Sequence, residues 1–158
     1  MVANENTIVK FYTALSKADT NKLCECYHPT IQFIDPIFGL LKGDEVCQMW
    51  KMLIESSKGN LKIEFSDVKA NDYLGSARWI ANYHFSKTNH KVVNKIYSKF
   101  HFKDGLIIKH TDDFDISKWA KQAMGLKGFL FGWTGFMQKK IQEQARFSLK
   151  TYIKKHAK

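Results

Sequence analysis

The spacing of apolar residues along this 158-residue chain changes from a helical to a strand period near residue 61. Four apolar residues close to the N-terminus recur at positions i, i+3, i+4 and i+7: Ile8, Phe11, Tyr12 and Leu15. That repeat indicates an amphipathic helix over residues 7–17. Beyond residue 60, three apolar residues alternate with charged or polar ones: Leu61, Ile63 and Phe65. A chain with helices first and strands later is expected to form an α+β domain in which an antiparallel sheet curls around the helices.

Two further helices are predicted before the long strands. The first begins after a cap at Asp19 or Thr20 and ends at Pro29, because proline cannot continue a helix. The second begins at Gly43-Asp44. Its apolar residues again recur at helical spacing: Val46, Met49, Trp50 and Leu53.

A short strand between these helices ends at Asp35, immediately before Pro36. Proline disfavours helical backbone in the residue before it, so the strand is expected to aim the Asp35 side chain. Four strands follow the helices, over residues 61–65, 77–85, 91–102 and 106–114. Lys103-Asp104-Gly105 is a tight-hairpin signal between the last two strands, which therefore pair in an antiparallel meander.

The positive charge is concentrated in the C-terminal part of the chain. Residues 124–158 hold eight Lys or Arg against Glu143, so that segment carries +7 of the net +10. The remainder is close to neutral, which favours a small-molecule site over a phosphate-binding groove. The tail also differs in composition, because residues 125–133 are rich in glycine and aromatic residues. We divide the chain into a domain over residues 1–126 and a C-terminal aromatic segment with a basic helix over residues 127–158.

The C-terminal helix is predicted over residues 134–155, and its apolar face is expected to pack on the same domain or on a dimer partner. That face comprises Met137, Ile141, Ala145, Leu149 and Tyr152. Its opposite, basic face carries Lys139, Lys140, Lys150, Lys154 and Lys155, which are either solvated or form a weak contact with an anionic membrane surface.

The cysteine pattern and the absence of long apolar runs favour a cytoplasmic protein. Cys24, Cys26 and Cys47 do not suggest a disulfide framework, and the first residues lack the apolar core of a signal peptide. No apolar run approaches the roughly 20 residues that span a bilayer.

Four segments, in order and spacing, resemble the NTF2-like superfamily, in particular its SnoaL-like polyketide-cyclase and ketosteroid-isomerase-like branch. They are FYTALSKAD at 11–19, YHPTIQFIDPIFG at 27–39 followed by Gly43, FKDGLIIKHTDDFD at 102–115, and QAMGL at 122–126. The resemblance implies a cone-shaped cavity between the concave face of the sheet and the covering helices.

Strand alternation suggests which residues face this cavity. If Asp112 faces inward, His110, Ile108 and Phe114 do too. On the neighbouring strands the inward set is Ile96, Ser98, Phe100 and Phe102, and then Trp79, Tyr83 and Phe85. The expected ligand pocket comprises Tyr12, Trp50, Trp79, Tyr83, Asn94, Ser98, Phe100 and Phe114. Aromatic walls of this kind suit a small apolar or aromatic molecule, although the same side chains also serve as packed core.

Three side chains are the candidate catalytic residues. Asp35 matches the general base of ketosteroid isomerases, but Phe11 and Ser98 stand where those enzymes have oxyanion donors, so steroid isomerisation is not expected. Asp112 matches the main aspartate of SnoaL-like cyclases. His110 lies two residues away on the same face, close enough to share a proton with it.

The alternative interpretations of these residues are structural: a turn at Asp35 and a hydrogen-bonded polar pair at His110 and Asp112. Their spacing fits no metal motif, so neither a metal nor a cofactor is predicted. Asp115 is expected to cap a helix over residues 116–123.

Three functions remain open at this point. The first is an acid/base enzyme of isomerase, cyclase or hydratase type that acts on a small apolar carbonyl compound. The second is a ligand carrier with the same cavity. The third is a protein that uses its basic helix to bind membranes or other proteins. A homodimer is expected, and specific binding of nucleic acid is not.

Overall fold

The computed structural model describes residues 2–126 and 134–157. Within these residues the helices are α1 (Val2–Ser16), α2 (Thr20–Glu25), α3 (Asp44–Ser56), α4 (Ile116–Met124) and α6 (Gly135–His156). The strands are β1 (Tyr27–Asp35), β2 (Gly39–Lys42), β3 (Lys62–Ala70), β4 (Leu74–His84), β5 (Lys91–Lys103) and β6 (Leu106–Asp113). The predicted aromatic segment 127–133 lies outside the described residues.

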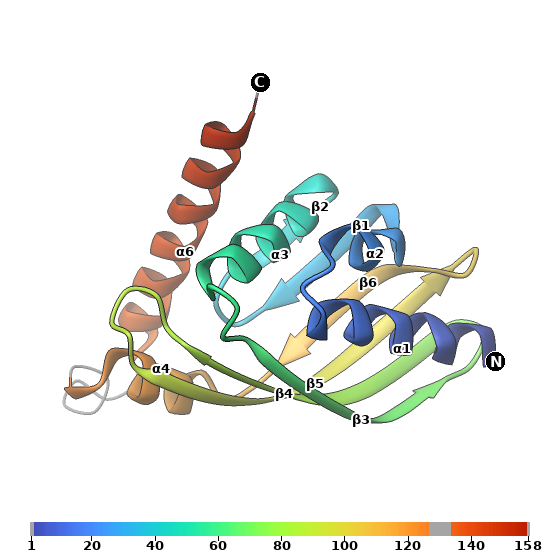
Figure 1. Cartoon of the computed structure of the whole chain (residues 1–158), viewed down its shortest axis with the longest axis horizontal. Coiled ribbons are helices and arrows are strands. Elements are labelled where there is room, and N and C mark those ends of the chain that lie inside the picture. The colour runs from blue at the N-terminus through green and yellow to red at the C-terminus, as the bar shows by residue number, and fades with distance from the viewer. Residues whose placement is uncertain (1, 127–133, 158) are drawn as a thin grey trace.

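The strands form one six-stranded curved sheet in the order β2-β1-β6-β5-β4-β3. Helices α1, α2 and α3 lie on the same side of this sheet, and α6 runs along its end beside α3 (Figure 1). The β3–β6 meander is antiparallel, as predicted, whereas β1 pairs with β6 in parallel. This confirms the α+β class.

The local signals that the sequence provides for turns and caps are present. Asp19 caps α2 by accepting from the Lys22 N–H, and Asp115 caps α4 by accepting from the Ser117 and Lys118 N–H groups. Asp104 and Gly105 both have positive φ, as a two-residue hairpin turn requires.

Three details of the predicted helices and strands are wrong. Helix α2 ends at Glu25 rather than at Pro29, which lies inside β1 where the pairing with β6 shifts register, a place that tolerates a residue without an N–H. The four-residue strand β2 was not predicted. Ile107, not Ile108, is buried, because a register shift opposite His101 and Phe102 reverses the alternation along β6.

The cysteine prediction is also wrong for one pair. Cys24 of α2 and Cys47 of α3 are joined as a disulfide across the two helices, while Cys26 is free and buried. The two residues are 23 positions apart in sequence, and only the packing of α2 against α3 brings them together.

Helix α6 packs against α3 and the β1–β2 turn. Ile141 and Leu149 are buried, and Arg146 Nη1 donates to the backbone oxygens of Phe38 (2.6 Å) and Leu40 (3.0 Å). Gly39 has φ of +70°, and a Cβ there would lie 2.5 Å from the Gln142 side chain. The turn therefore requires glycine both for its backbone conformation and for lack of space. The division of the chain at residue 126 remains a prediction.

The outward side of α6 carries exposed phenylalanines among its lysines. Phe136 and Phe147 are 75% and 71% exposed, and the Lys140 ammonium lies over the Phe136 ring. No helix in the described part of the chain has the length and hydropathy needed to cross a membrane.

Leu149→Ala should lower the free energy of unfolding by about 2–4 kcal/mol, because it leaves a cavity where α6 meets the core. The matched control on the same helix is Phe147→Ala, which should change it by less than about 0.5 kcal/mol, since this side chain is exposed. Urea unfolding followed by tryptophan fluorescence measures both. Equal effects of the two variants would show that α6 does not pack as described.

Candidate functional site

A cavity of about 300 Å³ opens between the sheet and helices α3, α4 and α6. Its inner wall is made of buried side chains, mostly aromatic or aliphatic: Phe33, Phe38, Met49, Trp50, Trp79 and Trp119. Two carboxyl groups, of Asp35 and Asp112, also line it. The volume lies at the lower end of the range for small-molecule sites.

Asp112, on β6, is 4% exposed and is held by hydrogen bonds to one of its oxygens. Its Oδ1 accepts from Ser98 Oγ (2.5 Å) and is bonded to His110 Nε2 (2.8 Å). Among the described residues, no group forms a hydrogen bond with Oδ2. The carboxyl group is thereby fixed by one oxygen and keeps the other for a ligand.

Behind Asp112, a buried chain of donors determines the tautomer of His110. Trp50 Nε1–H donates to Tyr27 Oη (3.0 Å), so the hydroxyl proton of Tyr27 is left to donate to His110 Nδ1 (2.8 Å). A ring that accepts at Nδ1 carries its proton at Nε2 and donates it to Asp112. The bonds therefore run in one direction, from Trp50 to Asp112.

A second branch reaches Asp112 through Ser98. Tyr12 Oη donates to Ser98 Oγ (2.7 Å), and Trp79 Nε1–H donates to the same oxygen (2.9 Å). With both acceptor positions of Ser98 filled, its hydroxyl proton is directed to Asp112. Burial raises the pKa of Tyr12 well above its usual value, and the charge on Asp112 adds to this, so Tyr12 stays protonated as a donor.

Aromatic rings enclose His110 and separate it from the cavity. Its ring is fully buried and lies 4.6 Å from that of Phe100 and 5.1 Å from that of Phe33, centroid to centroid. The Phe11 ring meets it edge-on at 5.4 Å. A ligand in the cavity does not reach His110, which can act only through Asp112.

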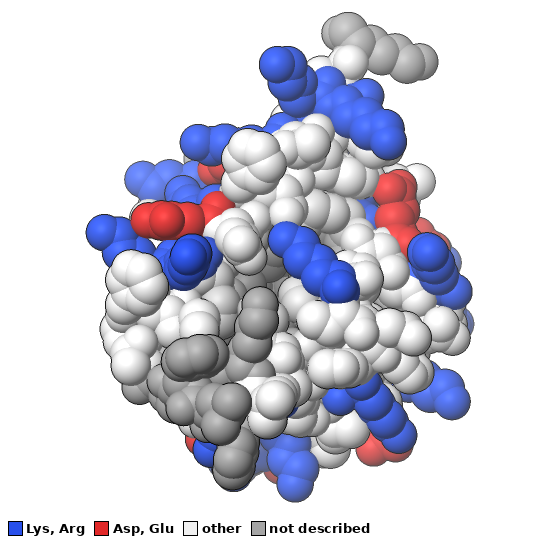
Figure 2. Space-filling model, turned by 90° about the vertical axis from the view of Figure 1, so that its left-hand side faces the viewer, with Lys and Arg blue, Asp and Glu red and all other residues white. Residues whose placement is uncertain are grey.

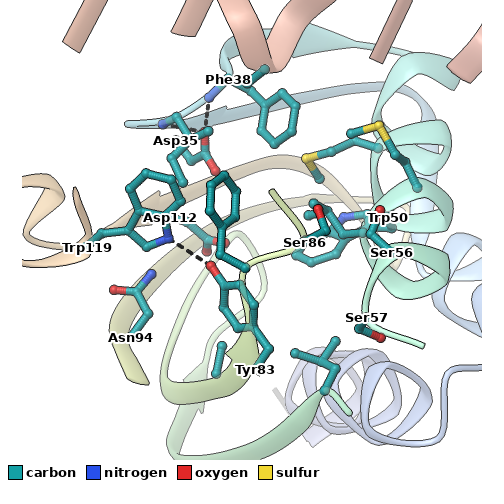
Figure 3. Close-up of a pocket in the computed structure, with 18 of the residues that line it drawn as sticks. Asp35, Phe38, Trp50, Ser56, Ser57, Tyr83, Ser86, Asn94, Asp112 and Trp119 are labelled. Carbon is teal, nitrogen blue, oxygen red and sulfur yellow. Dashed lines mark hydrogen bonds between the residues drawn. The ribbon is translucent and has the colours of Figure 1, made fainter. Parts of the chain in front are cut away.

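Asp35 is the last residue of β1 and faces the same cavity next to Asp112, because β1 pairs with β6 (Figure 3). Its Oδ1 accepts from the backbone N–H groups of Ile37 (3.0 Å) and Phe38 (2.6 Å). Burial, together with the charge on Asp112, raises the pKa of the Asp35 carboxyl to about 7, although the two backbone N–H groups lower it. A carboxyl group that titrates near neutrality can both donate and accept a proton.

Tyr83 and Trp119 form a third polar element of the cavity. Trp119 Nε1–H donates to Tyr83 Oη (2.8 Å), so the hydroxyl proton of Tyr83 is available to a ligand (Figure 3). Burial raises the pKa of Tyr83 to about 12, so the hydroxyl stays protonated. Asn94, which is also buried, adds an amide to the wall.

The structure brings some of the residues that we singled out to the cavity and leaves others behind it. Asp35, Asp112, Trp50, Trp79, Tyr83, Asn94 and Phe114 line the cavity. His110, Tyr12, Ser98 and Phe100 are buried behind this lining.

Sequence reasoning missed much of the cavity wall, including Phe33, Phe38 and Met49. Trp119 of α4 was read only as part of a capped helix. Ile141, Gln144, Ala145 and Ser148 make α6 a cavity wall. The apolar face of α6 was visible in the sequence, but nothing showed which surface it would meet. Among the described residues no group of three His, Cys, Asp or Glu side chains is placed to hold a metal ion.

Asp35→Asn should stabilise the protein at pH 8 and leave it nearly unchanged at pH 4. The pKa of Asp35 is about 7 in the folded protein against an ordinary value of 3.8. Between these values the folded state binds a proton that the unfolded state has lost, so its contribution to stability falls as pH rises from about 4 to 7. Asparagine keeps the oxygen that accepts from Ile37 and Phe38 and removes this penalty.

We expect a gain of about 1–3 kcal/mol in the free energy of unfolding at pH 8, measured by urea denaturation at several pH values. Asp113→Asn, an exposed neighbour of Asp112, is the control. If the free energy of unfolding of Asp35→Asn differs from that of the wild type by the same amount at pH 4 and at pH 8, the pKa of Asp35 is not raised.

The comparisons with known proteins agree with this architecture. Three solved structures have the same fold: Bal32a from a soil-derived mobile gene cassette (TM-score 0.68, 20% identity, covering 76% of this chain and 95% of that one), TerC co-crystallised with polyporic acid (0.66, 12%, 76% and 97%) and IdmH from Streptomyces antibioticus, a proposed polyketide cyclase (0.63, 16%, 75% and 96%). No functionally curated protein matches the chain. The SnoaL-like domain family matches residues 8–110, more than half of the sequence, and the chain therefore belongs to the SnoaL-like family of NTF2-like proteins.

Proposed function

We propose that this protein binds a small, flat, apolar carbonyl compound in its cavity and moves protons on it by acid/base chemistry that needs no cofactor. One observation carries the proposal. Two carboxyl groups in different hydrogen-bonding environments, Asp35 and Asp112, face one apolar cavity. Pairs of this kind divide the roles of acid and base between them. The fold it shares with TerC and IdmH is consistent with an aromatic or polyketide-like ligand.

Asp112 is the base in this proposal. Ser98 and His110 hold its Oδ1, which leaves Oδ2 to take a proton from the carbon next to the carbonyl group. His110 is a positioning residue, because both of its ring nitrogens are engaged within the core. The sequence suggested His110 as a catalytic residue that shares a proton with Asp112, and the proposal revises that role.

Tyr83 and Asp35 act at the carbonyl oxygen. As the C–H bond breaks, its electron pair forms the enolate, and the negative charge moves to this oxygen. The Tyr83 hydroxyl donates a hydrogen bond to it, strengthened by the bond that Tyr83 accepts from Trp119. Asp35, whose pKa is about 7, supplies a proton in its neutral form and recovers one when the product forms.

A carrier that binds the same ligand without turnover is the competing function. The apolar walls alone would suit it, and Asp35 and Asp112 would then serve only to orient the ligand. The two functions differ in one measurable property, which is catalysed exchange of the protons next to the carbonyl group.

Asp112→Asn should slow proton exchange by about 10²- to 10⁴-fold, the usual contribution of one positioned base. The probe is 2-tetralone, a flat bicyclic ketone with exchangeable α protons, followed in D₂O by NMR. The control is Asp113→Asn, on the opposite face of β6, which should catalyse exchange of the ketone protons at the wild-type rate. Wild-type protein that binds the ketone without accelerating its exchange, or an Asp112→Asn variant with full activity, would support the carrier instead.

Tyr83→Phe should reduce the exchange rate by about 10²- to 10³-fold with little change in ketone affinity, since it removes a donor that acts mainly on the charged oxygen. Tyr73→Phe is the matched control, because Tyr73 is 74% exposed. If Tyr83→Phe weakens binding and leaves the rate of the bound ketone unchanged, Tyr83 is a wall of the pocket and not an oxyanion donor.

A further inference from the structure

The mouth of the cavity is defined by the lining residues that remain exposed. They come from the end of α3, from the end of β4 and the chain that follows it, and from α6: Leu53, Ser56, His84, Ser86, Lys87 and Gln144. Except for Leu53, all of them are polar. The cavity thus changes along its length from a buried aromatic interior to a polar rim.

Lys87 is the only lysine or arginine among the described residues that line the cavity. Its ammonium group donates to Ser148 Oγ of α6 (3.3 Å), which also lines the cavity, so the side chain reaches from the chain after β4 to α6. Within the described part of the chain, no carboxylate lies within ion-pair distance of Lys87. Its charge is available to a ligand.

The opposite end of the cavity carries acidic groups. Asp112 and Asp35 lie on the inner wall, where a ligand anion would meet the negative charge of Asp112 in poorly solvated surroundings. At the mouth, an anion would meet the Lys87 ammonium and the donors of Ser86, Ser148 and Gln144. This distribution of charge orients a ligand that is anionic at one end.

We propose that the natural ligand is an amphipathic acid, with a flat apolar body in the cavity and an anionic carboxylate, sulfonate or phosphate group on Lys87 at the mouth. The inference rests on the proposed function, because it places the outer end of the ligand whose carbon next to the carbonyl group meets Asp112. Gln144 and Ser148 lie beyond residues 8–110, so the α6 side of this rim is not accounted for by the part of the chain that the family covers.

Two fluorescent dyes that share one apolar body test the proposal. 8-Anilinonaphthalene-1-sulfonate is anionic, and N-phenyl-1-naphthylamine lacks the sulfonate. We expect the wild-type protein to bind the anionic dye more tightly and the two dyes to compete. Lys87→Met should lower the affinity for the anionic dye by about 3- to 10-fold and change the affinity for the neutral dye by less than 2-fold. The preference should shrink as salt is added.

Two further variants test whether the effect comes from the Lys87 charge at the mouth rather than from the net charge of the protein or from the packing of the Lys87 side chain. Lys87→Arg keeps the positive charge and should keep the preference for the anionic dye. Lys150→Met removes a lysine from α6 that does not line the cavity, and it should alter neither affinity.

The proposal is overturned if Lys150→Met lowers the affinity for the anionic dye as much as Lys87→Met does, or if Lys87→Met lowers the affinity for both dyes equally. It is also overturned if the two dyes do not bind or do not compete with each other. The neutral ketone used for proton exchange has no anionic group, so the proposed catalysis can succeed or fail independently of this result.

Discussion

The hydrogen bonds that converge on Asp112 are the interaction on which the rest of this structure depends. A buried carboxylate is costly unless it is hydrogen-bonded, and here its two donors, Ser98 and His110, lie on β5 and β6. The groups behind them come from α1, α3, β1 and β4, so the network ties the helices to the sheet. Among the described residues no buried side-chain nitrogen or oxygen lacks a partner.

The same network separates the polar core from the cavity. Every donor is directed toward Asp112 Oδ1, and the aromatic rings that carry or surround these donors form the cavity wall or lie just behind it. Asp35 is bonded differently, to backbone N–H groups of its own turn, and its pKa is raised by burial. Two aspartates of identical chemistry are thus made unequal by their surroundings, which acid/base chemistry on one ligand requires.

Much of the fold could be predicted from local signals. The strand period, the Asp104-Gly105 turn and the caps at Asp19 and Asp115 are interactions between residues close in sequence, and the structure contains each of them. Prediction was wrong where distant partners decide the outcome. The register shift on β6 buries Ile107 in place of Ile108, and the short strand β2 exists because β1 is there to pair with it.

The sequence by itself determined most of the helices and strands, the alternation that turns Asp112 inward, and the strand end that carries Asp35. It did so because both periodicities follow from backbone geometry and burial of one face. Only the tertiary structure decided that His110 lies behind the cavity, that Cys24 meets Cys47, and that α6 and Lys87 line the cavity. These outcomes depend on contacts between segments far apart in the chain, and on the loss of water around Asp35, which no local pattern encodes.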